Sequence, residues 1–275
     1  MISREQARRA FDEYVSAYDP TNPRIALKID HTLRVAELCD RIASSEGLDS
    51  DVAWLCGLLH DVGRFEQVRR FNTFNDAVSV SHAALGADVL FGDADPRGPQ
   101  IRAYVDEDDA PCVRPQRAVA TRDDDKPLTR LDDLLRTAIA THSAYRIPEE
   151  LDPQTRAYCH VLRDADKIDI IKVNCICPIE DIYGVSERDM FESKLSPAVV
   201  EGFYEHRTLP RNIREYPADV LVGHICFAWE LVYSESRRIL AEQGYLERML
   251  SRHFARPDTQ HTFERMAEHM RAWLR

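Results

Sequence analysis

The sequence lacks a long apolar run, and this absence bears on its cellular location. No stretch of 18 consecutive apolar residues occurs, and a membrane-spanning helix needs about 20. The first residues carry several charged side chains in place of the apolar centre of a signal peptide. We therefore expect a cytoplasmic protein that has no membrane partner.

Paired cysteines are also missing. The seven cysteines are an odd number and include no CxxC pair. Most of them lie inside apolar helical segments, so we interpret them as small buried side chains of a protein in a reducing compartment. Cys175 and Cys177 form a lone CxC, which is a weak metal signal.

Positive charge is in deficit. The chain has 47 Asp and Glu against 36 Lys and Arg, which gives a net charge of −11 with histidine neutral. Proteins that bind nucleic acid need a positive field to attract the phosphates, so this balance argues against a nucleic-acid partner in general. A local basic pocket stays compatible with it. Apolar residues make up 44% of the chain, which is enough for a hydrophobic core.

What the sequence does contain is helical periodicity, and no convincing run of alternating strand residues accompanies it. We predict an all-α protein, a helical bundle with additional C-terminal helices. The segment at about 51–62 is apolar on all sides, so we expect it in the middle of the fold. The helices are predicted at about residues 4–18, 24–46, 51–62, 76–91, 130–144, 153–173, 196–206, 217–242 and 258–274.

We expect one domain over residues 1–275. Its core, about 20–178, holds the polar residues of interest, and residues 92–128 are rich in Pro, Asp, Arg and Gly, which is typical of a long insertion. Residues 179–275 form a C-terminal helical extension in this interpretation. The apolar segment around 220–229 packs either within the chain or in a homodimer, and the sequence leaves both open.

Polar residues occupy apolar positions on five predicted helices. One histidine on an apolar face is usually an ordinary core residue, but five helices repeat the exception. A buried carboxylate needs a counter-charge, and imidazoles together with carboxylates provide a site for a divalent cation such as Mn, Fe, Mg, Ni or Zn. The candidate metal ligands are His31, His60, Asp61, His82, His142 and Asp166.

The order and spacing of these residues resemble the HD-domain metal-dependent phosphohydrolases, whose hallmark is H…HD…D on a helical bundle. The resemblance covers about residues 25–175. The dipeptide His60-Asp61 alone is common by chance. It becomes specific inside LLHDVGR (58–64), with a histidine on an earlier helix and the tripeptide ADK (165–167) on a later one.

The resemblance implies a role for each matching residue. His31, His60, Asp61 and Asp166 correspond to the four hallmark ligands. His82 and His142 fall where the two-metal branch of the family has extra histidines, so the resemblance leaves one or two ions open. Arg64 follows Asp61 by three residues, where relatives often place a cation toward the substrate phosphate, and Asp61 and Arg64 are therefore the predicted catalytic residues.

The activity implied is hydrolysis of a small phosphoester, a nucleotide or a related metabolite, by metal-activated water. Such an enzyme is either a phosphomonoesterase or a phosphodiesterase, and its partner is a small phosphorylated substrate. The alternatives are a regulatory module that binds a metal and a nucleotide without turnover, and a di-iron oxygenase, which needs more carboxylate ligands than the sequence offers. No Walker loop or GxGxxG motif narrows the substrate further.

Several other charged side chains are interpreted from their position alone. Asp76 is most simply the N-cap of the helix predicted at 76–91. Arg69 and Arg70 either border a phosphate site or are solvated. Lys167 either contacts phosphate or pairs with Asp164 one turn earlier.

Overall fold

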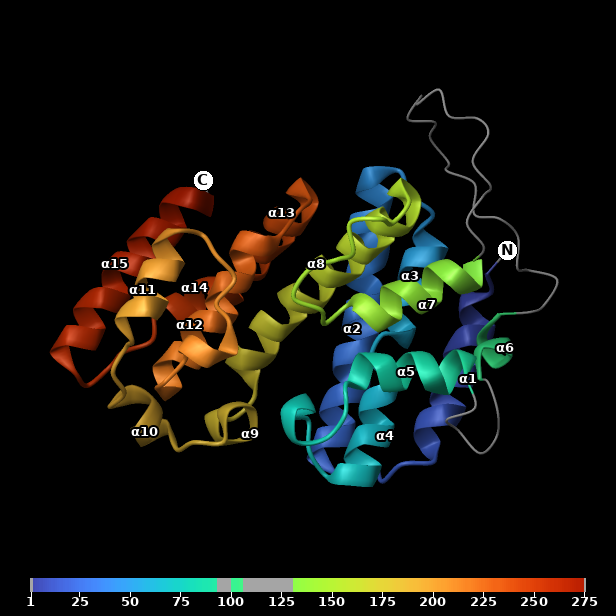
Figure 1. Ribbon diagram of the computed structural model, residues 1–275, viewed down its shortest axis with the longest axis horizontal. Coiled ribbons are helices and arrows are strands. Elements are labelled where there is room, and N and C mark those ends of the chain that lie inside the picture. The colour runs from blue at the N-terminus through green and yellow to red at the C-terminus, as the bar shows by residue number, and fades with distance from the viewer. Residues whose placement is uncertain (1, 93–99, 106–130, 275) are drawn as a thin grey trace. The chain divides into compact units, whose positions relative to one another are not determined.

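The structure is a computed structural model that describes residues 2–92, 100–105 and 131–274 (Figure 1). Within these ranges the chain forms helices and short 3-10 turns and contains no strand, so the all-α prediction is confirmed. The main helices are α1 (Arg4–Ser16), α2 (Pro23–Glu46), α3 (Ser50–Leu59), α4 (Val62–Phe71), α5 (His82–Phe91), α7 (Leu131–Thr141), α8 (Pro153–Ile176), α11 (Pro197–Tyr204), α12 (Pro217–Ile225), α13 (Ser234–Gln243) and α15 (Pro257–Leu274).

The chain divides into two compact units, residues 1–165 and 166–275, and α8 runs through the boundary. The first unit holds α1 to α7 and the start of α8, and the second holds the helices from α9 (Ile179–Tyr183) onward. The assignment of one domain over the whole chain stays a prediction. Most of the predicted insertion at 92–128 lies outside the described residues, and its described part is the short helix α6 (Ile101–Tyr104).

Helix α3 lies in the core of the first unit, as its apolar character predicts. Asp49 caps it by accepting hydrogen bonds from the N–H groups of Asp51 and Val52. Every residue from Val52 to Leu59 is buried. A Cβ on Gly57 would lie 2.6 Å from the Cα of Ala36. Helices α2 and α3 therefore approach each other as closely as a glycine allows.

A second glycine brings the start of α4 against α5. A Cβ on Gly63 would lie 2.1 Å from the carbonyl oxygen of His82 and 2.5 Å from the backbone nitrogen of Gly86. Backbone atoms cannot yield as a flexible side chain can, so this position requires glycine. The contact joins the segment that follows Asp61 to the first turn of α5.

Several predicted helix bounds are wrong, and the reasons are local. The helix predicted at 51–62 ends at Leu59, and a separate helix, α4, begins at Val62. The helix predicted from residue 76 begins at His82, because Ser81 accepts a hydrogen bond from the N–H of Ala84 and caps it there. The helix predicted at 217–242 is interrupted by a 3-10 turn, Cys226–Glu230. Short helices were missed: α9, α10 (Glu187–Phe191) and α14 (Tyr245–Leu250).

A helix must be both long and apolar to cross a lipid bilayer. None of the helices in the described ranges combines these two properties.

Candidate metal centre

The predicted ligands come from separate elements. His31 lies on α2, His60 and Asp61 join α3 to α4, His82 begins α5, His142 follows the end of α7, and Asp166 lies on α8. The four histidines and Asp61 are at most 4% exposed, and Asp166 is half-buried. Burying so many polar groups is unfavourable unless they have partners, so the burial of the four histidines and Asp61 needs an explanation.

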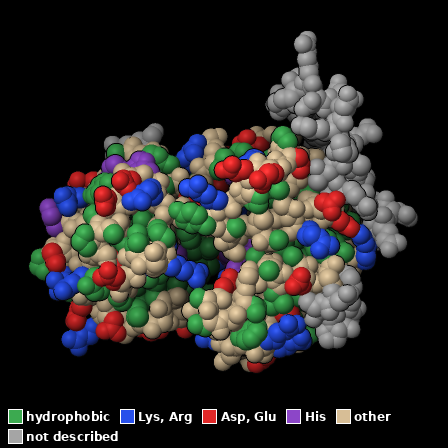
Figure 2. Space-filling view, viewed as in Figure 1, with side chains coloured by type: hydrophobic (Ala, Val, Ile, Leu, Met, Phe, Trp, Pro, Cys, Tyr) green, Lys and Arg blue, Asp and Glu red, His purple; other side chains and the backbone are tan. Residues whose placement is uncertain are grey.

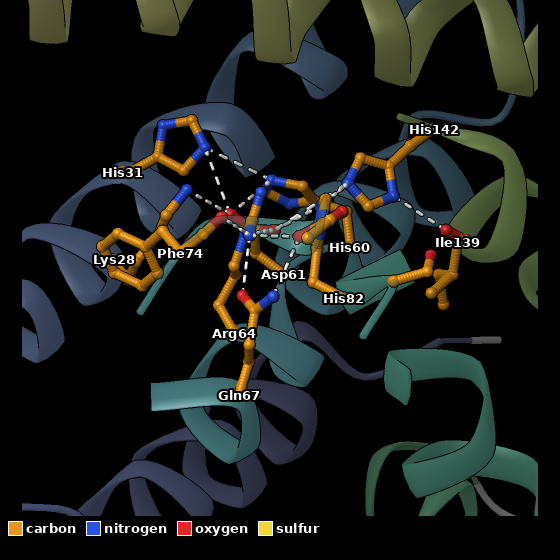
Figure 3. A network of polar contacts seen from close by, with 12 residues as sticks. Lys28, His31, His60, Asp61, Arg64, Gln67, Phe74, His82, Ile139 and His142 are labelled. Carbon is orange, nitrogen blue, oxygen red and sulfur yellow. Dashed lines mark hydrogen bonds and ion pairs between the residues drawn. The ribbon is translucent and has the colours of Figure 1, made fainter. Parts of the chain in front are cut away.

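Asp61 lies between two pairs of histidines (Figure 3). Its Oδ2 is 3.5 Å from Nε2 of His31 and 3.4 Å from Nε2 of His60. Its Oδ1 is 3.6 Å from Nε2 of His82 and 3.8 Å from Nε2 of His142. Within each pair the two Nε2 atoms are close, 3.3 Å for the first pair and 3.0 Å for the second. Each carboxylate oxygen thus faces its own pair of imidazole nitrogens.

Backbone carbonyls fix two of the imidazoles in a metal-binding form. His60 Nδ1 is 2.7 Å from the carbonyl oxygen of Gly57, and His142 Nδ1 is 2.7 Å from that of Ile139. A carbonyl oxygen only accepts hydrogen bonds, so each Nδ1 carries the proton and donates it. The lone pair of each neutral ring is then on Nε2, the atom that faces Asp61.

The described ligand atoms form three groups, each with its atoms within 4.8 Å of one another. One hallmark ligand, Asp166, groups with His60 and His142 rather than with His31. Nitrogen and oxygen donors of this kind fit Mn, Fe, Mg, Ni or Zn, and none of the groups among the described residues contains a thiolate. Among the described residues, Cys175 and Cys177 belong to none of these groups. The groups are His31–His60–Asp61, Asp61–His82–His142 and His60–His142–Asp166.

The carboxyl of Asp61 is ionised in spite of its burial. Burial alone raises the pKa of Asp61, but the charge of Lys28 and the contacts with His60 and His82 hold that pKa well below its usual range. Lys28 Nζ lies 2.6 Å from Asp61 Oδ2, and its side chain is 14% exposed. The sequence analysis missed Lys28, although it lies one turn before His31 on the same face of α2.

Arg64 lies close to Asp61, and Gln67 together with the loop before α5 holds it in place. Its Nη1 donates to Gln67 Oε1 at 2.7 Å, to the carbonyl oxygen of Phe74 at 2.7 Å and to Asp76 Oδ1 at 2.8 Å. Its Nε is 3.7 Å from Asp61 Oδ1. In the described part of the chain this buried Nε has no hydrogen-bond partner. The guanidinium is therefore fixed on one side and unsatisfied on the side toward Asp61.

Asp76 is not the N-cap of α5. Its Oδ2 accepts a hydrogen bond of 2.7 Å from His82 Nδ1, while Asn75 caps the 3-10 turn Asp76–Val78. Burial raises the pKa of Asp76, but the hydrogen bond from His82 and the charge of Arg64 lower it far more, so the carboxylate is an anion. Asp76 thus orients His82 and Arg64 together. The sequence could not distinguish this role from helix capping, since both use an aspartate before a helix.

The remaining charged candidates have other partners. Arg69 and Arg70 are exposed, as the solvated alternative expects, and they donate to Oε2 of the buried Glu66 at 2.7 and 2.9 Å. Lys167 pairs with Glu230, with Nζ 2.8 Å from Oε2. Arg163, which the sequence analysis did not single out, donates to the carbonyl oxygen of His142 at 3.0 Å and so holds the end of α7 in place.

A match to a known family covers this site. The HD domain model matches residues 29–171, just over half of the chain. The chain belongs to the HD domain family. The resemblance to the HD-domain metal-dependent phosphohydrolases is therefore confirmed, together with the helical fold that it implied.

One curated protein illustrates how local the similarity to named relatives is. Ribonuclease Y of Opitutus terrae is 39% identical to this HD domain protein over 62 residues. The alignment spans 22% of the chain and 10% of that protein. No solved structure matches the chain. The family model over residues 29–171 establishes the family, whereas the similarity to Ribonuclease Y is too short to assign an activity or a substrate.

Proposed function

We propose that this HD domain protein is a metal-dependent phosphohydrolase that acts on a small phosphoester, a nucleotide or a related metabolite. One observation carries the proposal: Asp61 lies between two histidine pairs, with each of its oxygens 3.4–3.8 Å from two Nε2 atoms. The donor atoms around this carboxylate are of the kind that would hold one or two divalent ions. His31, His60, His82, His142 and Asp166 are the residues that would hold them.

A divalent metal held by these residues would supply Lewis acidity to activate water and to neutralise charge on the phosphoryl group. The protein's own residues prepare the site. The carbonyls of Gly57 and Ile139 keep the Nε2 lone pairs of His60 and His142 available. Asp76 fixes Arg64 beside Asp61, so this cation needs little reorganisation to contact a substrate phosphate.

A small substrate fits the charge of the molecule better than a polynucleotide does. The net charge is −11, and on the face drawn in Figure 2 the described acidic and basic side chains are intermixed. An extended polyanion would gain little from such a surface. The similarity to Ribonuclease Y supports phosphoester chemistry, but it spans a tenth of that protein, so action on RNA is not transferred.

Metal analysis followed by a panel of phosphoesters, with and without Mn²⁺, tests the proposal. We expect Mn²⁺-dependent release of phosphate or of a phosphorylated product, and loss of that activity in Asp61→Ala with the helical circular dichroism unchanged. The matched control is Asp12→Ala, which removes an exposed carboxylate of α1 paired with Arg8. Full turnover by Asp61→Ala contradicts the mechanism. Metal and nucleotide binding without turnover would instead identify a regulatory module.

A further inference from the structure

Two cations and one aromatic ring lie beside Asp61. Lys28 Nζ is 5.5 Å from the centroid of the Phe74 ring, and Arg64 Cζ is 5.6 Å from it. The side chains of Lys28 and Arg64 are only 14% and 15% exposed. Figure 3 shows both of them reaching toward Asp61. The proposed metal site therefore has two positively charged side chains beside it, Lys28 and Arg64, and both lie over the Phe74 ring.

The two cations lie next to different carboxylate oxygens of Asp61. Lys28 contacts Oδ2, the oxygen that also faces His31 and His60, whereas Arg64 Nε is nearest Oδ1. An ion held by Oδ2 and these two histidines would use the same carboxylate oxygen that the ammonium group of Lys28 contacts. Two cations on one carboxylate oxygen repel each other strongly in a buried site. An ion held there would therefore compete with Lys28 for Asp61 Oδ2 and weaken that contact.

The Phe74 ring would keep Lys28 at the site after its contact with Asp61 is broken. The face of the Phe74 ring attracts an ammonium group without neutralising it. Arg64 Nε already lacks a hydrogen-bond partner among the described residues. The loaded site would then present two cations with unfilled hydrogen-bonding capacity, one on each side of Asp61, which calls for an anionic ligand with at least two charged oxygens.

We propose that Lys28 and Arg64, supported by Phe74, form a receptor for a terminal, dianionic phosphate, which makes the substrate class a phosphomonoester. This inference rests on the proposed function and deepens it. A phosphomonoester carries close to two negative charges at neutral pH and has three oxygens free for recognition. A phosphodiester carries one charge, so its two free oxygens can contact both cations but neutralise only one of the two positive charges.

The proposal predicts opposite effects of Lys28 on two ligands. In Lys28→Met, Mn²⁺ alone should bind several-fold tighter than to the unmodified protein, because its competitor for Asp61 is gone. Inorganic phosphate should bind the Mn²⁺-loaded variant about 10-fold more weakly, the loss of one charge-assisted contact. Lys28→Arg should restore most of the phosphate affinity. The control is Lys172→Met, which removes a lysine that lies over Tyr245 in the second unit.

Calorimetry with Mn²⁺ and then with inorganic phosphate measures both constants, and circular dichroism verifies folding. An unchanged phosphate dissociation constant in Lys28→Met overturns the proposal, as does weaker Mn²⁺ binding, which indicates a structural role. If Lys28→Met does not fold, Lys28→Gln is measured in its place. Kinetics with 4-nitrophenyl phosphate and bis(4-nitrophenyl) phosphate separate this inference from the proposed function. Hydrolysis confined to the diester overturns the inference alone, whereas hydrolysis of no phosphoester overturns the function.

Discussion

The carboxylate of Asp76 accepts a hydrogen bond of 2.7 Å from His82 Nδ1, in a loop that precedes the helix carrying this histidine. The same carboxylate accepts from Arg64 at 2.8 Å. One side chain therefore sets the tautomer of a proposed metal ligand and the position of a proposed phosphate contact.

Replacing Asp76 by asparagine should weaken metal binding while the fold is kept. The substitution keeps the shape but removes the charge that fixes the His82 ring, and such supporting residues typically contribute about 10- to 100-fold in metal affinity. Competition with a chelating indicator measures the affinity. Asn75→Ala, which removes the cap of the adjacent 3-10 turn, is the control and should leave the affinity within a few-fold. Equal losses in the two variants would mean that the loop fold alone matters.

His82→Ala and His142→Ala decide between one and two ions. If both histidines hold a second ion, each substitution should lower the metal count from two toward one after full loading and sharply reduce hydrolysis. Elemental analysis gives the count directly. His253→Ala, at an exposed position of the second unit, is the control. A wild-type metal count in both variants would leave His82 and His142 with a role in orienting water or substrate.

Gly63→Ala should destabilise the first unit. A Cβ would lie 2.1 Å from a backbone carbonyl oxygen of α5, so the two segments must separate, at a cost of about 1–3 kcal/mol or more. Chemical denaturation followed by circular dichroism measures the change. Gly184→Ala is a useful comparison, since its Cβ meets no atom within 4 Å but its φ is +69°. Only the first variant should also lower metal affinity, because only Gly63 contacts the His82 backbone.

The second unit should lose stability as the pH falls from about 6.5 toward 3. Burial desolvates His224, and this effect together with the charges of Arg214 and Arg211 lowers its pKa to about 3. In the unfolded chain this histidine has an ordinary pKa of about 6.5, so in this pH range the unfolded state binds a proton that the folded state does not bind. The free energy of unfolding should fall by up to about 1.4 kcal/mol per pH unit in this window.

Urea denaturation at pH 7 and pH 5 measures this effect. His224→Gln should flatten the dependence, because the glutamine does not titrate. The matched change His261→Gln, at an exposed position of α15, should leave the slope as it is. If the free energy of unfolding of His224→Gln depends on pH as in the unmodified protein, another group causes the loss of stability at low pH.

The sequence by itself determined the helical fold and the composition of the centre. Periodic apolar residues specify helices locally, so the periodicity alone identifies a histidine or aspartate on an apolar stripe as a buried polar group. His31, His82, His142 and the pair His60-Asp61 were found in this way. The sequence also contains Gly63 in the same motif, but the need for a glycine there comes from its close approach to the backbone of α5.

The partners of these groups were decided by tertiary structure alone. Lys28 and Asp61 are 33 residues apart and Arg64 and Asp76 are 12 apart, and their contacts form only when α2, α4 and the loop before α5 pack together. Periodicity says that a side chain is buried, but not which group it meets. Asp76 was therefore taken for a cap and Lys28 was overlooked. The division of the histidines between the two oxygens of Asp61 is set by the packing of α2, α3, α5 and α7 around one carboxylate.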